Sequence, residues 1–490
     1  MTSKRQKTKT AEAVSNGSPS FPQAAQNMLD FINHAWTPFH AVEEASRRLV
    51  AAGFQKLSER AEWNLQPGGR YFFTRNMSTL VAFAIGAQYQ PGNGFHMLGA
   101  HTDSFDDGSV DSLRHQPEGP CLILHVVRSL MLISAQVKFD KPLMHIPMLA
   151  IHLQPEIREK GFNPNKQTQL GPILAVAAKA SLDKQKKSDA EDLKPESKAG
   201  EEKKEEERHH AALLNLLSSQ LGCTPEAIVD FELHICDVQP STLGGMEDEF
   251  VFSGRLDNLA MSFCSLQALL DVHGDPASLA DDANIKAVAL FDHEEVGSAS
   301  AQGAGGPVMR DTITRVAGVL SGGSEGAVVR ALQSSFLVSA DMAHALHPNY
   351  ADKHDGQHQP RFGQGLVIKH NSNQRYATNA VSATLFRELA KQHGIPTQDF
   401  AVRSDMGCGS TIGPILASGL GCRTVDVGLA QLAMHSIREM CSSGDIGLAI
   451  EHFTAFFKEF SSLDASINID GLSPPVLQGT LEDTPCNHVQ

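Results

Sequence analysis

The sequence predicts an α/β fold with helices on both faces of a sheet. In the second half of the chain, short apolar runs typical of buried strands alternate with segments of helical period. This alternation is typical of α/β sheets. Several runs end in polar residues, and such sheets place their functional groups at the carboxyl ends of the strands. With 490 residues the chain is long enough for two or more domains with separate cores.

Hydrophobic periodicity predicts each element in turn. Met28, Phe31 and Ile32 recur at helical spacing, so the first element is expected to be helical. The expected helices are 26–54, 211–221, 259–272, 381–393 and 446–460. The expected strands are 71–73, 79–85, 95–100, 142–153, 231–236, 250–252, 285–291, 335–339, 400–403 and 423–427.

Two stretches are too polar to fold on their own. Residues 1–22 are basic and then rich in Ser, Gly and Pro, and residues 182–207 are a Lys/Glu-rich low-complexity run. Neither can bury enough apolar surface to offset the entropy of ordering. We therefore expect a disordered tail and a solvated loop, with a second tail over 466–490.

Composition excludes several classes of partner. The net charge of −15 and pI near 5.8 argue against nucleic acid and anionic membranes. No apolar run approaches the ~20 residues that cross a bilayer, and the N-terminus lacks the apolar core of a secretory signal. The eight cysteines form no C-x-x-C pair, which favours a reducing, cytoplasmic location.

An acidic pair follows the expected strand that ends at Phe291. Glu294 and Glu295 lie where the chain bends away from the sheet at Val296-Gly297-Ser298. At such a bend one carboxylate can hold a metal ion while its neighbour faces a substrate. The alternative is an exposed acidic turn.

A similar polar group follows the strand at 95–100. His101 is followed two residues later by Asp103. That aspartate can accept the second N–H of the imidazole, as the partners of metal-binding histidines do.

Residues suited to a metal centre recur at or just after the ends of apolar strands. Two histidines, two aspartates and a glutamate are about what two hydrolytic metal ions need, with one aspartate bridging and a further glutamate taking a proton from the shared water. The residues are His101, Asp257, Glu294, Glu295, Asp341 and His435. Two alternatives stay open, because Asp257 could cap a helix ahead of Leu259 and His435 could cap the helix after it.

The sequence resembles the M18 aspartyl aminopeptidases from about residue 25 to residue 460. The resemblance is carried by His101-Thr102-Asp103-Ser104, Arg255-Leu256-Asp257-Asn258, Asp292-His293-Glu294-Glu295-Val296-Gly297-Ser298, Ser339-Ala340-Asp341-Met342-Ala343-His344-Ala345-Leu346-His347-Pro348-Asn349-Tyr350 and Gln431-Leu432-Ala433-Met434-His435-Ser436-Ile437-Arg438-Glu439. It implies a mixed-sheet metallopeptidase domain with an inserted β-rich assembly domain. It also implies a tetrahedral homododecamer.

The resemblance also implies roles for individual residues. His101 and Asp341 would bind one metal ion, Glu295 and His435 the other, and Asp257 would bridge them. Both ions would be divalent, Zn²⁺ first, with Mn²⁺ or Co²⁺ as alternatives. Glu294 would be the general base.

The implied substrates are peptides with an N-terminal Asp or Glu. An acidic side chain buried without a cation is costly. Lys369, in the family-like segment Val367-Ile368-Lys369-His370-Asn371-Ser372, is the candidate cation, with an ordinary surface lysine as the alternative. His344, His358 and Tyr376 are the further candidate contacts.

The resemblance breaks between Ser104 and Lys138. In the family this stretch holds a tryptophan-containing loop that contributes to a neighbouring subunit's active site, whereas this chain has only Trp36 and Trp63. We expect a truncated insert, and a splicing or gene-prediction error over 105–137 would explain it. Sequencing the transcript tests that explanation.

The expected division of the chain follows from the resemblance. The expected parts are a tail at 1–22, a metallopeptidase domain at 23–104 and 246–465, an inserted assembly domain at 105–245 and a tail at 466–490. Two other functions remain open: an inactive or weakly active member with an assembly or cargo role, and a related dinuclear zinc hydrolase of other specificity.

Overall fold

The structure is a computed structural model. It describes residues 21–104, 120–128, 133–139, 141–154, 157, 161–174, 176 and 209–467. The charged run at 182–207 and most of both expected tails lie outside the described residues. Phe21 and Pro22, which we assigned to the N-terminal tail, instead begin the first helix.

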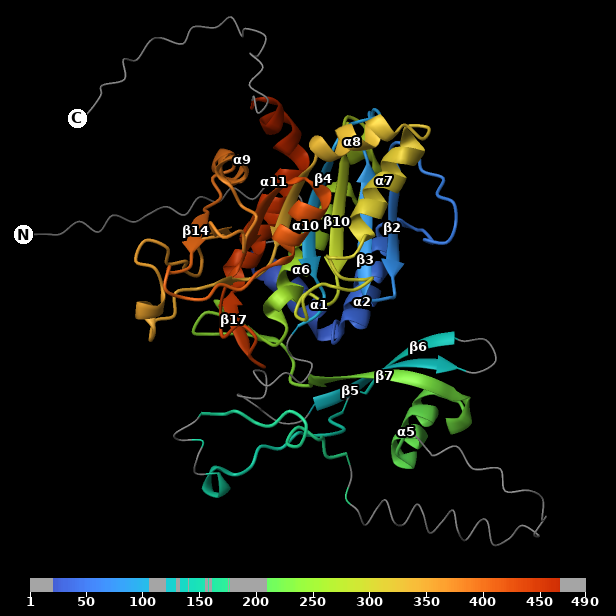
Figure 1. The fold of residues 1–490 in the computed structure, drawn as a ribbon, viewed down its shortest axis with the longest axis vertical. Helices are drawn as coiled ribbons and strands as arrows, with labels where there is room; N and C mark the ends of the chain where they lie inside the picture. Colours follow the sequence, from blue (N-terminus) through green and yellow to red (C-terminus); the bar gives the residue numbers. More distant parts are fainter. Residues whose placement is uncertain are drawn as a thin grey trace, which may run out of the picture.

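A nine-stranded mixed sheet forms the centre of the larger body (Figure 1). In spatial order its strands are β1 (Gln55–Lys56), β2 (Arg70–Arg75), β3 (Thr79–Ile85), β10 (Ile285–Phe291), β4 (Phe95–His101), β11 (Phe336–Ala340), β15 (Arg423–Gly428), β13 (Val367–His370) and β14 (Gln398–Ala401). The four neighbours β10, β4, β11 and β15 run parallel. Their carboxyl ends therefore meet at one edge of the sheet, where Phe291 pairs with His101.

Helices cover both faces of this sheet, as predicted (Figure 1). Because successive strand residues point to opposite faces, Leu98 and Ala100 pack into one core while Phe95 and Met97 pack into the other. The helices of the first core are α1 (Phe21–His34), α2 (Pro38–Ala51), α6 (Leu256–His273), α9 (Ala380–Gln392) and α11 (Ser443–Ala465). Those of the second are α7 (Val308–Leu320), α8 (Glu325–Gln333) and α10 (Ile412–Leu420).

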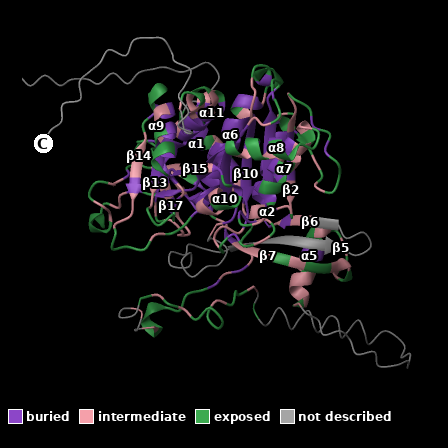
Figure 2. Cartoon of the chain, turned by 45° about the horizontal axis from the view of Figure 1, so that its top comes forward, coloured by how far each residue is buried: buried purple, intermediate pink, exposed green. Residues whose placement is uncertain are grey.

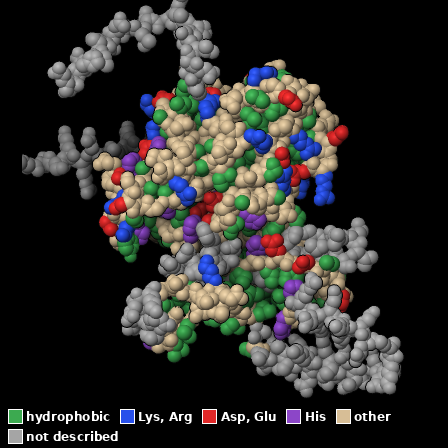
Figure 3. Space-filling model, viewed as in Figure 1, with side chains coloured by type: hydrophobic (Ala, Val, Ile, Leu, Met, Phe, Trp, Pro, Cys, Tyr) green, Lys and Arg blue, Asp and Glu red, His purple; other side chains and the backbone are tan. Residues whose placement is uncertain are grey.

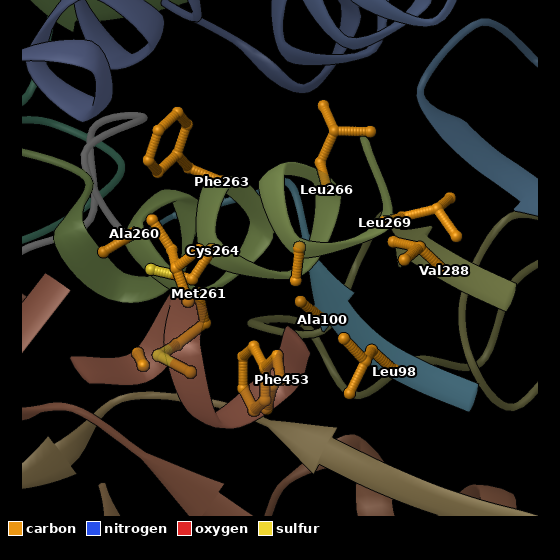
Figure 4. Packing of buried hydrophobic residues seen from close by; sticks show 14 of the residues in the cluster. Leu98, Ala100, Ala260, Met261, Phe263, Cys264, Leu266, Leu269, Val288 and Phe453 are labelled. Atoms are coloured by element: carbon orange, nitrogen blue, oxygen red, sulfur yellow. The ribbon is translucent and has the colours of Figure 1, made fainter. Parts of the chain in front are cut away.

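Helix α6 is buried around much of its circumference. Figure 4 shows its residues Met261 and Leu269 among Leu98 of β4, Val288 of β10 and Phe453 of α11. All five side chains are fully buried, so α6 is held against the sheet along its length.

Two smaller sheets complete the described chain. One has the order β12 (Ala343–His344), β16 (Ala430–Leu432), β17 (Glu439–Ser442), β9 (Phe250–Ser253) and β8 (Thr242–Gly244). The other has the order β6 (Ile133–Lys138), β5 (Pro120–Arg128) and β7 (Ile228–Asp237), and it carries α5 (Ala211–Leu221). Four short 3₁₀ helices are η2 (Ile151–Leu153), η3 (Pro225–Ala227), η4 (Pro276–Leu279) and η5 (Ala351–Lys353).

The three-stranded sheet lies outside the larger body, where the expected insert would be (Figure 1). Most side chains of β7 are less buried than those of the central sheet (Figure 2). The boundary at 245 stays a prediction, and β8 already pairs with β9 of the larger body.

The predicted strand at 142–153 is wrong. The structure has there an isolated bridge between His145 and Ile173, followed by η2. Pro142 and Pro147 carry no backbone N–H to donate, which disfavours a continuous ladder. The predicted helix over 26–54 is two helices, α1 and α2, with Thr37 as the N-cap of α2.

Within the described residues, every helix is too short or too polar to span a bilayer.

Candidate metal centre

His101 is the last residue of β4 and is 1% exposed. Its Nδ1 lies 3.0 Å from the carbonyl oxygen of Asp103, so Nδ1–H donates to that oxygen. Its Nε2, left with a lone pair, faces three carboxylates: Asp257 at 3.4 Å, Asp341 at 3.5 Å and Glu294 at 3.9 Å. A fixed tautomer with an available lone pair is how histidine binds metal ions.

The acidic pair lies at the end of β10, and the carboxylate of Asp103 holds its main chain. Asp103 Oδ1 accepts the N–H of Glu294 at 3.1 Å, and its Oδ2 accepts the N–H of Glu295 at 2.9 Å. The Asp103 carboxylate is also 3.3 Å from His101 Nδ1. Asp103 therefore positions both glutamates and contacts the histidine that the sequence assigned to it.

Asp257 lies between the two histidines. Its Oδ1 faces His101, and its Oδ2 is 3.2 Å from His435 Nε2. Nε2 of His435 is also 3.7 Å from Glu295. The structure thus brings together residues that are more than 300 positions apart in the sequence.

The two capping alternatives are not what the structure shows. Arg255 is the N-cap of α6, while Asp257 has non-helical φ and ψ and directs its carboxylate at two imidazoles. His435 is followed by strand β17 rather than by a helix.

Asp341 directly follows β11 and has a second partner besides His101. Its Oδ2 lies 3.5 Å from the Nζ of Lys369 on β13. Lys369 is 2% exposed and donates to the carbonyl oxygen of Met342 at 2.9 Å. The alternative of an ordinary surface lysine is therefore wrong.

Crowding of buried carboxylates shifts their proton affinity. Burial, together with the charges of Asp341 and Asp257, raises the pKa of Glu294 to about 7. Burial, and next the charge of Asp257, raises the pKa of Glu295 to about 11. Burial would also raise the pKa of Asp257, but its contacts with His101 and His435 outweigh burial and lower it.

The donor set fits a metal ion. Oδ1 of Asp257 and Oε1 of Glu295 are buried without a hydrogen-bond partner among the described residues. Buried carboxylates are stable when a cation neutralises them. Ligand atoms within 4.8 Å of one another occur in three groups: His101, Asp257 and Asp341; Asp257, Glu295 and His435; and His101, Glu294 and Glu295. In Figure 3 acidic and histidine side chains lie near one another in the middle of the molecule, above the smaller lower part.

A cavity of about 260 Å³ lies between β14 and the segment that precedes His435. It is lined by His344, Met434 and Phe400 among others, and Met434 directly precedes His435. Tyr376 is buried, with its ring 5.3 Å from Lys369 Nζ. His358 pairs with Asp355 at 2.8 Å and is not among the residues that line the cavity.

A known family profile matches most of this chain. The sequence profile described as aminopeptidase I zinc metalloprotease (M18) matches residues 31–106 and 123–457. The chain belongs to the M18 family.

Similar sequences agree with this family. The chain is 48% identical over 477 residues to a probable aspartyl aminopeptidase of Ricinus communis, covering 91% of this chain and 97% of the relative. It is 42% identical over 499 residues to an aspartyl aminopeptidase of Aspergillus oryzae, covering 91% and 98%. The M18 chain is thus a metallo-aminopeptidase, and the predicted activity is confirmed.

Solved M18 structures share the fold. The cryo-EM structure of the Ape4 and Nbr1 complex matches with a TM-score of 0.80 and 36% identity, over 92% of this chain and 89% of that one. The crystal structure of prApe1 matches with a TM-score of 0.77 and 26% identity, over 91% and 97%. The predicted α/β class is confirmed.

The interruption in the family match of this M18 chain is shorter than predicted. The family match resumes at residue 123, not at Lys138, and β5 pairs with both β6 and β7. The interruption is therefore confined to 107–122.

Sequence reasoning gave no role to Glu439. Its only signal was its place in the family-like segment that contains His435.

Proposed function

We propose that this chain removes Asp or Glu from the N-terminus of peptides, using two divalent metal ions, with Zn²⁺ the first choice. The observation that carries the proposal is that two of the candidate ligand groups share Asp257. His101 and Asp341 would hold one ion, and Glu295 and His435 the other, with Asp257 between them. Such a pair of ions polarises the scissile carbonyl and lowers the pKa of a bound water.

Glu294 is the residue placed to move the proton. Its side chain is 15% exposed and lies 3.9 Å from His101 Nε2. It therefore lies beside the group of His101, Asp257 and Asp341 and is not a member of the group of Asp257, Glu295 and His435. The bond from its N–H to Asp103 fixes its main chain. In the proposed reaction Glu294 takes the proton of the attacking water and delivers it to the leaving amine.

Lys369 supports selectivity for acidic residues. It is a buried ammonium group that donates a hydrogen bond to the carbonyl oxygen of Met342 and lies 3.5 Å from the carboxylate of Asp341, a candidate metal ligand. A carboxylate at the N-terminal residue of a substrate would gain an ion pair with it, whereas an apolar side chain would not. His344, Tyr376 and His358 remain predicted contacts, and His344 lines the adjacent cavity.

We also propose that the chain forms a homo-oligomer through its insert, with the dodecamer as the expected assembly. The solved structure of the S. cerevisiae mApe1 dodecamer matches this chain with a TM-score of 0.73 at 25% identity. Large apolar side chains are exposed among the described residues of 146–176, as expected of an interface: Met148, Leu149, Ile151, Leu153, Ile173 and Val176. No specific observation favours an inactive member or a hydrolase of other specificity.

One assay tests the proposal. Peptides that begin with Asp, Glu or Leu are compared as substrates with Zn²⁺ or Mn²⁺ added, and metal content is measured in parallel. We expect two ions per chain and preferential cleavage of the acidic peptides. Equal cleavage of the Leu peptide would refute the selectivity, and one ion per chain at full activity would refute the dinuclear centre.

A further inference from the structure

Three of the candidate ligands, Asp257, Glu295 and His435, are not held by a strand ladder, and the main chain of Glu295 is held by Asp103. Asp257 lies at the irregular start of α6, and His435 has a left-handed φ of 64° in the connection between β16 and β17. His101, by contrast, is fixed by the register of β4 with its neighbours. Some other contact must therefore hold Asp257 and His435 at the 3.2 Å separation of their side chains.

That contact is the buried carboxylate of Glu439. Its Oε2 accepts the N–H of Asp257 at 3.1 Å, and its Oε1 accepts the N–H of His435 at 3.0 Å. Oε1 also accepts the amide of Gln431 at 3.3 Å. Glu439 is 1% exposed and pairs with Ser253 of β9, so its own main chain is anchored in a sheet.

The geometry matches that of Asp103 on the other side of the centre. Each carboxylate uses its two oxygens to hold the main-chain N–H groups of two cluster residues. Hydrogen bonds to an ionised acceptor are shorter and stronger than neutral ones. Neither Glu439 oxygen belongs to a candidate ligand group.

We infer that Glu439 is a positioning residue that sets the separation of Asp257 and His435, and thereby the affinity of the Asp257–Glu295–His435 group for its metal ion. The inference rests on the proposed dinuclear function, because it assigns Glu439 to one of the two ligand groups. Glu439 acts through the main chain and touches neither ion nor substrate. Losing such an outer partner typically weakens metal binding by about 10- to 100-fold.

The test compares Glu439→Gln with a matched control. Glutamine keeps the size of the side chain but turns one acceptor into an amide donor that opposes an N–H. Asp445→Asn is the control, because Asp445 is also a fully buried carboxylate that accepts two main-chain N–H groups, from Gly363 at 2.8 Å and Gly365 at 2.9 Å, and it belongs to no candidate ligand group. Folding of both variants is followed by circular dichroism and melting temperature.

Metal binding separates the outcomes. Metal-free protein is titrated with Zn²⁺ and with Co²⁺, whose absorption spectrum reports ligand geometry. We expect Glu439→Gln to bind one of two ions at least tenfold more weakly than wild type, with an altered Co²⁺ spectrum, while Asp445→Asn loses only thermal stability. A second variant, Glu439→Asp, keeps the charge but is too short to span both N–H groups, so it should also weaken the site.

Two results would count against the inference in distinct ways. Wild-type affinity and spectrum in Glu439→Gln, with a loss of stability equal to that of Asp445→Asn, would make Glu439 purely structural. Fewer than two ions in the wild type would instead overturn the proposed dinuclear function and leave the role of Glu439 without its basis.

Discussion

Replacing Lys369 by methionine removes the cation proposed to select acidic substrates and keeps most of its volume. The ammonium group is 2% exposed, 2.9 Å from the carbonyl oxygen of Met342 and 3.5 Å from Asp341. Two unit charges 4 Å apart interact by about 4 kcal/mol at an effective dielectric constant of 20. Because desolvation of the pair offsets part of this energy, we expect a loss of about 3 kcal/mol, or somewhat more than 100-fold.

The assay is the ratio of kcat/KM for an Asp peptide to kcat/KM for a Leu peptide. Lys369→Met should lower this ratio by about 100-fold. The control is Lys286→Met, which removes another buried lysine (1% exposed) that pairs with Asp282 at 3.0 Å near the opposite end of the sheet. It should lose stability without changing the ratio. Metal content is measured because Asp341 loses its ion-pair partner in Lys369→Met, and an unchanged ratio at unchanged metal content would refute the reasoning.

Three further predictions concern the base, the ions and a buried histidine. Glu294→Gln should retain metal but lower kcat by about 10²- to 10⁴-fold, measured by turnover and metal analysis, and loss of metal along with turnover would argue for a ligand role instead. Removing the metal ions with a chelator should lower the melting temperature, because free metal at about 1,000 times its Kd stabilises the folded state by about 4 kcal/mol. An unaltered calorimetric transition would contradict a buried metal centre. His452 is fully buried, and burial lowers its pKa to about 3. In the unfolded chain this imidazole binds a proton below about pH 6.5, whereas in the folded chain it stays neutral down to about pH 3. Stability should therefore fall as the pH drops through this window, by up to about 1.4 kcal/mol per pH unit, and denaturant titrations should show a flatter dependence for His452→Gln.

Much of the centre was predictable because strand ends are visible in a sequence. The apolar runs that end at His101, Phe291 and Ala340 are buried strands of the central sheet. Parallel neighbours align their carboxyl ends, so the polar residues that follow them must converge. Convergence could be inferred without knowing any distance between the side chains.

Other features depend on partners that periodicity does not reveal. Lys369 looks like any lysine in an extended segment, and only the packing of β13 between β15 and β14 shows that it is buried. The apolar residues of 142–153 suggested a strand, but the segment is irregular, and Met148, Leu149, Ile151 and Leu153 are exposed there. A run of apolar residues indicates that its side chains are buried in the working protein, and in an oligomer another subunit can bury them.

The division between the two ligand groups has a consequence for the shortened insert. His101 and Asp341 depend on the register of the central sheet, which the insert does not enter. His435 depends on the segment that ends at Glu439, and the neighbouring Arg438 binds the chain where it returns from the insert: Asp237 at 2.9 Å and the carbonyl oxygens of Gln239 at 2.6 Å and Pro240 at 3.2 Å. A displacement of the insert is therefore transmitted through Arg438 to the group of Asp257, Glu295 and His435. Restoring the family loop at the interruption should accordingly change the metal affinity of that group, which Zn²⁺ titration of the two chains measures.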